Sequence, residues 1–380
     1  MYTIAGYGSM IADRVRMAAY EAALRRAVRP GCVVLDLGAG TGIMALLACR
    51  FGARHVHAVE PGDAVHAARA IADANGLGDR ITFYQDVSTN LTLPERADVI
   101  VSDLRGVLPL LGRHVPTLAD ARRRLLAPGG ALIPQRDTLW AAPVEAPDHY
   151  RRLVGVWEDS GYDFDLTAAR RLVVNTWGKA RVAPEQLLAE PRCWATLDYT
   201  TRDAPDVAAR VEWAPGRAGA AHGLAVWFDT TLLDAVALSN APGGPELIYG
   251  QAFFPFAEPL AVAPGDRMAA AVEARLVGDE YVWTWEAQLH DAAGGVKAAR
   301  RQTSLAANPV TPAALRRRSA DHVPVLDEEG EVDRFVLARM DGARTLAAIA
   351  RAAAAAFPDR YPAWLDALPR VGELSQKYGK

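Results

Sequence analysis

The chain has 380 residues, of which 51% are hydrophobic, and its formal net charge is −3 at pH 7. This length predicts two or three domains, and the small net charge argues against a nucleic-acid partner held by bulk charge. The sequence has neither the apolar leader of a secreted protein nor an apolar run long enough to cross a membrane, so we expect a cytoplasmic protein without a membrane partner.

The first predicted elements are a helix, a strand and a glycine-rich turn. Helical spacing of apolar residues predicts a helix over residues 10–26. Residues 33–37 are apolar apart from Asp36, which predicts a buried parallel strand. In Gly38-Ala39-Gly40-Thr41-Gly42 the glycines allow a sharp turn and a close approach to a ligand. Residues 43–50 then predict a helix whose first N–H groups face that turn.

A second strand is predicted over residues 55–59 and ends at Glu60, 24 residues after Asp36. An acid at this place in a βαβ unit binds the ribose of a nucleotide cofactor. A dinucleotide fingerprint would need a third glycine where Ile43 stands, which weakens that interpretation. An α/β domain with a glycine turn and no nucleotide is the structural alternative.

Strands and helices continue to alternate, with a helix predicted over residues 64–74 and strands over residues 81–85 and 99–102. This order predicts an α/β fold with a doubly wound, Rossmann-like parallel sheet. Ligands bind such sheets beyond the carboxyl ends of the strands. Four acids lie at or near these ends: Asp36, Glu60, Asp86 and Asp103.

The pattern changes beyond about residue 137. Pro128-Gly129-Gly130 predicts a turn, and a new strand is expected to begin at Ala131. Residues 267–276 and 281–289 alternate with period two, the second stretch with large rings, which predicts antiparallel strands around a barrel core. Helical spacing returns after residue 320, where Thr345 is expected to cap the second of three helices.

The pattern Asp-x-Gly-x-Gly-x-Gly at residues 36–42 resembles motif I of class I S-adenosylmethionine-dependent methyltransferases. The order of helix, methyltransferase sheet and β-barrel over residues 7–305 resembles the protein arginine methyltransferase family. That family carries Met-x-x-Asp-x-Val-Arg on the helix ahead of motif I. The matching residues are Met10, Asp13, Val15 and Arg16.

The resemblance implies S-adenosyl-L-methionine as cofactor and assigns its contacts. Arg16 would bind the carboxylate of the cofactor, and Asp36 would orient the turn or the cofactor amine. Glu60 would bind the ribose hydroxyls, and Asp86 with Val87 would bind the adenine. The expected cofactor-binding residues are Arg16, Asp36, Gly38, Ala39, Gly40, Thr41, Gly42, Glu60, Pro61, Asp86 and Val87.

The residues expected to bind the methyl acceptor depart from the pattern of the family. The family presents two glutamates in the pattern Ser-Glu-(x)8-Glu, and these hold a guanidinium that is always charged. Here Asp103 stands at the first position, Gly112 at the second, and Arg105 makes the loop basic. The family's Thr-His-Trp in the barrel is replaced by Leu247-Ile248-Tyr249. Asp103 is therefore the expected catalytic residue, as a carboxylate that orients the acceptor, while arginine chemistry is in question.

The function implied by the resemblance is methyl transfer to a peptide or protein acceptor, with a specialised nitrogen as acceptor rather than a general arginine. Two alternatives stay open: a small-molecule N- or O-methyltransferase, and a non-catalytic binding or scaffold protein that kept the cofactor fold. No metal site is expected, since His55 and His57 lack a third ligand with suitable spacing. The three cysteines are far apart and indicate a reducing compartment: Cys32, Cys49 and Cys193.

Three parts are predicted: a cofactor domain at 1–135, a β-barrel acceptor domain at 136–310 and a helical module at 320–380. Residues 157–165 resemble the family's dimerisation arm, which is expected at about 150–182. Apolar residues on a projecting arm need a partner to bury them, which predicts a homodimer. The last part resembles small winged-helix modules of peptide-modifying systems and is expected to recruit a peptide or to pack onto the barrel. The apolar arm residues are Val154, Val156, Trp157, Tyr162 and Phe164.

Overall fold

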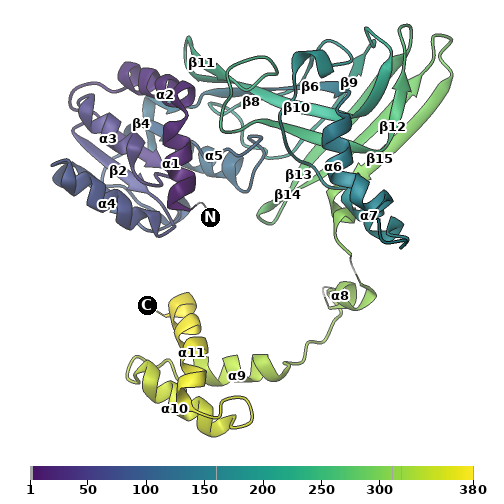
Figure 1. Ribbon diagram of the computed structural model, residues 1–380. Helices are drawn as coiled ribbons and strands as arrows, with labels where there is room; N and C mark the ends of the chain where they lie inside the picture. Colours follow the sequence, from purple (N-terminus) through teal and green to yellow (C-terminus); the bar gives the residue numbers. More distant parts are fainter. Residues whose placement is uncertain (1–2, 160, 310, 318, 380) are drawn as a thin grey trace. The chain divides into compact units, whose positions relative to one another are not determined.

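The computed structural model describes residues 3–159, 161–309, 311–317 and 319–379. The chain divides into two compact units, with the boundary between Pro309 and Val310. In the first unit a Rossmann-like half is followed by antiparallel sheets (Figure 1). Among the described residues, no helix combines the length and the apolar character that crossing a membrane requires.

A five-stranded parallel sheet forms the Rossmann-like half, in the order β3-β2-β1-β4-β5. This order confirms the doubly wound sheet predicted from the alternation of strands and helices. All five residues of the central strand β1 are buried, as expected for a parallel sheet covered by helices. The strands are β1 (Val33–Leu37), β2 (His55–Val59), β3 (Ile81–Tyr84), β4 (Ala97–Ser102) and β5 (Leu126–Ile133). The helices are α1 (Ile4–Ala12), α2 (Arg14–Ala27), α3 (Ile43–Arg50), α4 (Ala64–Ala74) and α5 (His114–Arg124).

The prediction of one helix over residues 10–26 is wrong, because the chain breaks at Asp13 into α1 and α2. Asp13 has extended backbone angles and is the N-cap of α2, where its side chain accepts a hydrogen bond from the Arg16 N–H at 3.0 Å. Its other carboxylate oxygen accepts from the Ile248 N–H at 2.7 Å. The apolar periodicity runs across the break, so it could not reveal the cap.

The prediction that a turn at Pro128-Gly129-Gly130 precedes a new strand is also wrong, since β5 runs through these residues. Ala97 of β4 pairs with Leu126, but Val99, only two residues further along, pairs with Ala131. The extra residues of β5 form an irregularity in the strand, and Gly129 takes a φ of 76° there. The turn residues therefore shift the register of one strand and do not separate two strands.

Two antiparallel sheets follow, in the orders β7-β12-β10-β6-β8, with β11 on β10, and β15-β14-β13-β9. The predicted alternation is confirmed on β14, where all five residues with buried side chains lie on one face. The strands are β6 (Arg136–Val144), β7 (Gly178–Ala180), β8 (Arg192–Asp198), β9 (Val207–Trp213), β10 (Gly219–Leu233), β11 (Val236–Ser239), β12 (Gln251–Val262), β13 (Arg267–Val277), β14 (Glu280–His290) and β15 (Val296–Thr303).

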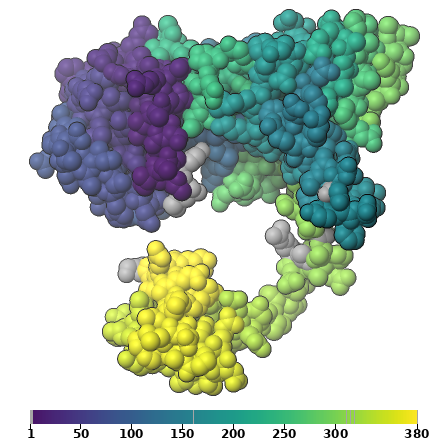
Figure 2. All heavy atoms as spheres, in the orientation of Figure 1, coloured from purple at the N-terminus to yellow at the C-terminus, as the bar shows by residue number. Residues whose placement is uncertain are grey.

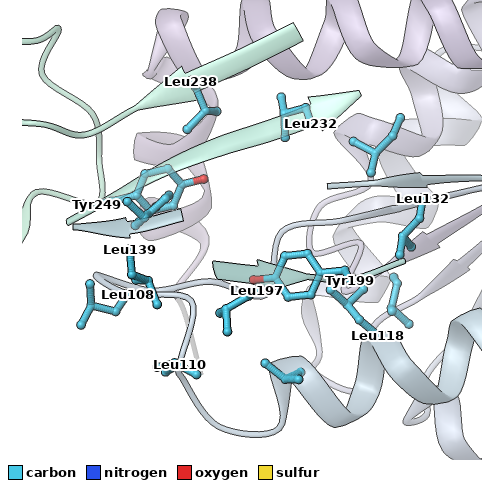
Figure 3. Close-up of a cluster of buried hydrophobic side chains, with 14 of the residues drawn as sticks. Leu108, Leu110, Leu118, Leu132, Leu139, Leu197, Tyr199, Leu232, Leu238 and Tyr249 are labelled. Carbon is cyan, nitrogen blue, oxygen red and sulfur yellow. The ribbon is translucent and has the colours of Figure 1, made fainter. Parts of the chain in front are cut away.

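One apolar core joins the Rossmann-like half to the antiparallel sheets. Leu132 of β5, Leu139 of β6 and Leu197 of β8 belong to it, and Figure 3 shows them around Tyr199 and Tyr249. The two halves of the first unit therefore share buried surface rather than meeting at a thin contact.

The arm helices α6 (Pro147–Glu158) and α7 (Thr167–Val173) lie beside the barrel strands (Figure 1). Val154, predicted as exposed arm surface, is instead fully buried and packs with the barrel in a small core of its own. Tyr162 and Phe164 are 76% and 77% exposed, so these two rings supply apolar surface on the arm.

The second unit contains α8 (Pro312–Arg316), α9 (Glu328–Leu337), α10 (Leu346–Ala356) and α11 (Trp364–Tyr378). Thr345 caps α10 as predicted, and its hydroxyl accepts from the Ala348 N–H at 3.2 Å. The last three helices enclose a separate apolar core, which includes Val336 and Ile349.

Candidate functional site

A pocket opens at the carboxyl ends of β1, β2 and β4, which is where the strand order of a doubly wound sheet places ligands. Helix α1 forms one wall of this pocket, and the N-terminal helices lie at the surface between the Rossmann-like half and the barrel (Figure 2). The pocket is lined by Tyr7, Met10, Ile11, Arg16, Asp36, Gly38, Ala39, Thr41, Ile43, Met44, Glu60, Asp103 and Leu104.

The glycine turn is closely packed and needs its glycines. Gly38 and Gly40 have φ values of 78° and 54°, which side chains rarely adopt. A β-carbon on Gly38 would lie 2.4 Å from Leu104, and one on Gly40 would lie 2.4 Å from the ring of Tyr7. The turn is therefore held between the loop after β4 and helix α1.

Two acids accept hydrogen bonds from the backbone, one at the glycine turn and one in the helix that follows it. The Asp36 carboxyl group accepts from the Ala45 N–H at 2.9 Å, and burial raises its pKa to about 7. Glu60 accepts from the Gly40 N–H at 3.0 Å and from the Gly62 N–H at 2.8 Å. A carboxylate has about four acceptor positions, so Glu60 keeps capacity for ligand hydroxyls.

Arg16 and Asp103 form a buried ion pair in the pocket wall. The Arg16 Nε and one terminal nitrogen lie 2.7 and 2.6 Å from the same oxygen of Asp103. The Tyr249 hydroxyl donates to that oxygen at 2.6 Å. Burial alone would raise the pKa of Asp103, but Arg16 and Arg105 outweigh it and hold the pKa at about 2.

Arg105 is fully buried and contacts the other oxygen of Asp103, at 3.1 Å from its Nε. One terminal nitrogen lies 3.0 Å from Asp137 and 2.5 Å from the Thr230 hydroxyl, and the other lies 2.5 Å from the Tyr20 hydroxyl. Both Asp103 oxygens are thus occupied by the chain's own donors. A carboxylate whose pKa is held at about 2 is a weak proton acceptor, and Asp103 positions the two arginines.

Seven of the predicted site residues line the pocket together: Arg16, Asp36, Gly38, Ala39, Thr41, Glu60 and Asp103. Gly40 and Gly42 belong to the same turn. Pro61, Asp86 and Val87 are outside the lining set, and Asp86 accepts from the Val87 N–H at 2.7 Å. The roles assigned to all of these residues stay predictions.

Sequence reasoning missed Tyr7 and Leu104, which pack against the glycine turn, and the pairing of Arg105 with Asp137. Tyr7 stands shortly before the recognised Met10 helix motif, which was a usable signal. Asp137 is 32 residues from Arg105 and lies on a barrel strand, so no local pattern connects them. Among the described residues no group of three or more His, Cys, Asp or Glu side chains could hold a metal ion.

The parallel sheet, glycine turn and acids at the strand ends define the class I methyltransferase fold. Two family models match the chain: "Ribosomal protein L11 methyltransferase (PrmA)" over residues 18–134, and "Arginine methyltransferase oligomerization subdomain" over residues 135–278. Together with the relatives below, these matches show that the chain is related to the protein arginine methyltransferase family.

The chain is similar to "Probable histone-arginine methyltransferase CARM1" of Oryza sativa subsp. indica, with 32% identity over 276 residues, 68% of this chain and 52% of that protein. It is also 32% identical over 230 residues to "Protein arginine N-methyltransferase 1" of Schizosaccharomyces pombe, covering 58% of this chain and 66% of that protein. The chain spans about half the length of the first two curated relatives that it matches.

Solved structures share the fold. Arabidopsis thaliana protein arginine methyltransferase 10 matches with a TM-score of 0.70 and 22% identity, over 80% of this chain and 98% of that one. A Trypanosoma brucei PRMT1 enzyme–prozyme complex with AdoHcy matches with the same score and identity, over 78% of this chain and 97% of that one.

Proposed function

We propose that the chain is an S-adenosylmethionine-dependent methyltransferase that acts on a peptide or protein acceptor. The observation that carries this proposal is the pocket itself, where one cation, Arg16, and two acids, Asp36 and Glu60, surround the glycine turn. An amino acid joined to a nucleoside needs such a set, namely a cation for its carboxylate and acceptors for its ammonium and hydroxyl groups.

The residues present fit this cofactor, which supplies a methyl group on a sulfonium when bound. Arg16 would hold the carboxylate, Asp36 the amine or the turn, and Glu60 the ribose. Asp86 and Val87, which follow the end of β3, would hold the adenine. The apolar wall from Ile43 and Met44 would exclude water from the pocket.

The acceptor proposed is a specialised nitrogen of a peptide or protein, and the relatives named above support a protein acceptor. We propose a homodimer formed through the arm, a cytoplasmic location in keeping with the three free cysteines, and peptide recruitment by the second unit. Asp103 is proposed to position Arg16 and the acceptor side of the pocket.

Two measurements test the function. Isothermal titration of S-adenosylmethionine into the full chain is expected to show binding, and its absence would favour a scaffold protein. Mass spectrometry after incubation with methyl-labelled cofactor then identifies the acceptor. Label on a small molecule, with none on any peptide or protein, would contradict the proposed acceptor class.

A further inference from the structure

The surroundings of Arg105 have the composition of a cation-binding site. Two carboxylates, Asp103 and Asp137, contact its guanidinium at 3.1 and 3.0 Å. The rings of Phe228, Tyr249 and Tyr20 face it at 5.4, 5.6 and 5.9 Å from its Cζ. We call this set, with Thr230, the Arg105 cage. Carboxylates and ring faces together are what a protein uses to bind a guanidinium or ammonium ligand.

The cage adjoins the pocket through Asp103. This residue lines the pocket, one of its oxygens pairs with Arg16, and the other pairs with Arg105. The other two acids in the pocket lining, Asp36 and Glu60, accept from the backbone N–H of Ala45 in α3 and of Gly40 in the turn. Asp103 is therefore the carboxylate through which a cationic acceptor would reach the cage.

The charges in this region already balance. Arg16 and Arg105 bring two positive charges, and Asp103 and Asp137 bring two negative ones, all on buried or nearly buried side chains. The neighbouring His114 is buried, and burial together with Arg105 lowers its pKa to about 3, so it stays neutral. A further guanidinium would leave one buried positive charge without a partner, which is strongly unfavourable.

We propose that Arg105 is a specificity-determining residue that fills a cation site of its own chain and thereby excludes arginine and lysine acceptors. This inference rests on the proposed function and narrows it to acceptors that are uncharged at the reacting group. It also gives Asp103 a positioning role, because both of its oxygens are held by arginines of the chain.

The test measures thermal unfolding of the full chain with and without about 10 mM methylguanidinium. Arg105→Ala empties the cage, and methylguanidinium is expected to raise its melting temperature by at least about 3 °C, since a ligand that binds only the folded state stabilises it. Wild type and Arg105→Lys, whose cages are filled, should shift by less than about 1 °C. Arg122→Ala is the matched control, because it removes an arginine that pairs with Asp203 and two carbonyl groups but lies in no such cage. Methylguanidinium should not raise the melting temperature of this variant by a comparable amount.

A short arginine-containing peptide provides a second measurement. Wild type should not methylate it at about 1 mM, whereas Arg105→Ala should bind it more tightly than wild type does. Methylation of this peptide by wild type would overturn the inference, as would a folded Arg105→Ala that gains no more from methylguanidinium than Arg122→Ala. Titration with S-adenosylmethionine is run in parallel: if wild type does not bind the cofactor, the proposed function fails while the methylguanidinium result still decides on the cage.

Discussion

Asp36 links the stability of the fold to pH. Its pKa is raised to about 7 in the folded chain by burial, against about 3.9 in an unfolded one. The folded state therefore keeps a proton that the unfolded state has lost, and stability decreases as pH rises from about 4 to 7, by up to about 1.4 kcal/mol per pH unit, and then levels off.

We predict that Asp36→Asn removes this part of the pH dependence while keeping the bond to the Ala45 N–H. Melting temperatures of both proteins between pH 5 and 8 provide the measurement. Parallel curves for wild type and variant would show that Asp36 is ionised throughout that range.

Glu60 gives a second prediction at this scale. Glu60→Ala should weaken binding of S-adenosylmethionine by about 1–3 kcal/mol, because ribose hydroxyls lose a charged acceptor. Glu60→Gln is the control. Its amide oxygen can still accept a hydrogen bond from the backbone, so this variant loses the charge but keeps one of the two bonds that Glu60 makes. Calorimetric titration measures both, and an unchanged dissociation constant in folded Glu60→Ala would remove Glu60 from the cofactor site.

The sequence revealed the residues that act within one short motif and missed those that act across the fold. Asp36, the glycines and Glu60 lie within one βαβ unit, where spacing along the chain fixes spacing in the structure. The contact of Arg105 with Asp137 depends on how a barrel strand packs against the end of β4, and no periodicity encodes this. Long-range packing therefore determines which residues surround Asp103 and Arg105 beside the pocket.

At the scale of elements, Asp13 joins two helices to a loop: it ends α1, caps α2 and accepts from Ile248 ahead of β12. We predict that Asp13→Ala costs about 1–2 kcal/mol of stability from the lost cap and also weakens cofactor binding, because Arg16 follows in the first turn of α2. Thr3→Ala is the matched control, since Thr3 caps α1 through the Gly6 N–H. Denaturant unfolding and cofactor titration compare the two, and equal effects on both would contradict a joining role for Asp13.

The last three helices of the second unit enclose a core of their own, so their removal should leave the first unit folded. We predict that a chain ending at residue 318 keeps its cofactor affinity and loses peptide affinity, at least about tenfold, or about 1.4 kcal/mol. Titration of cofactor, and of an acceptor peptide identified by mass spectrometry, into both chains tests this. Unchanged peptide affinity in the folded, shortened chain would leave the unit without a recruiting role.

For the molecule as a whole, the exposed rings on the arm bear on assembly. We predict a homodimer at micromolar concentration, and a monomer for Tyr162→Ser combined with Phe164→Ser, because these rings would be buried by the partner. Val277→Ser combined with Val296→Ser removes similarly exposed apolar residues outside the arm and should leave the dimer intact. Light scattering distinguishes the outcomes, and a monomeric wild type would refute the dimer.

The apolar core shared by the two halves of the first unit also governs how the pocket can open. Halves that bury side chains against each other cannot swing apart without losing that burial, so a hinge motion between them is unfavourable. Helix α1 differs, because none of its residues is buried, although Tyr7 lies over the glycine turn. A nine-residue helix of this kind is only marginally stable, so its fraying is the low-energy motion at the pocket. The residence time of a bound cofactor would then be set by how often this one helix opens.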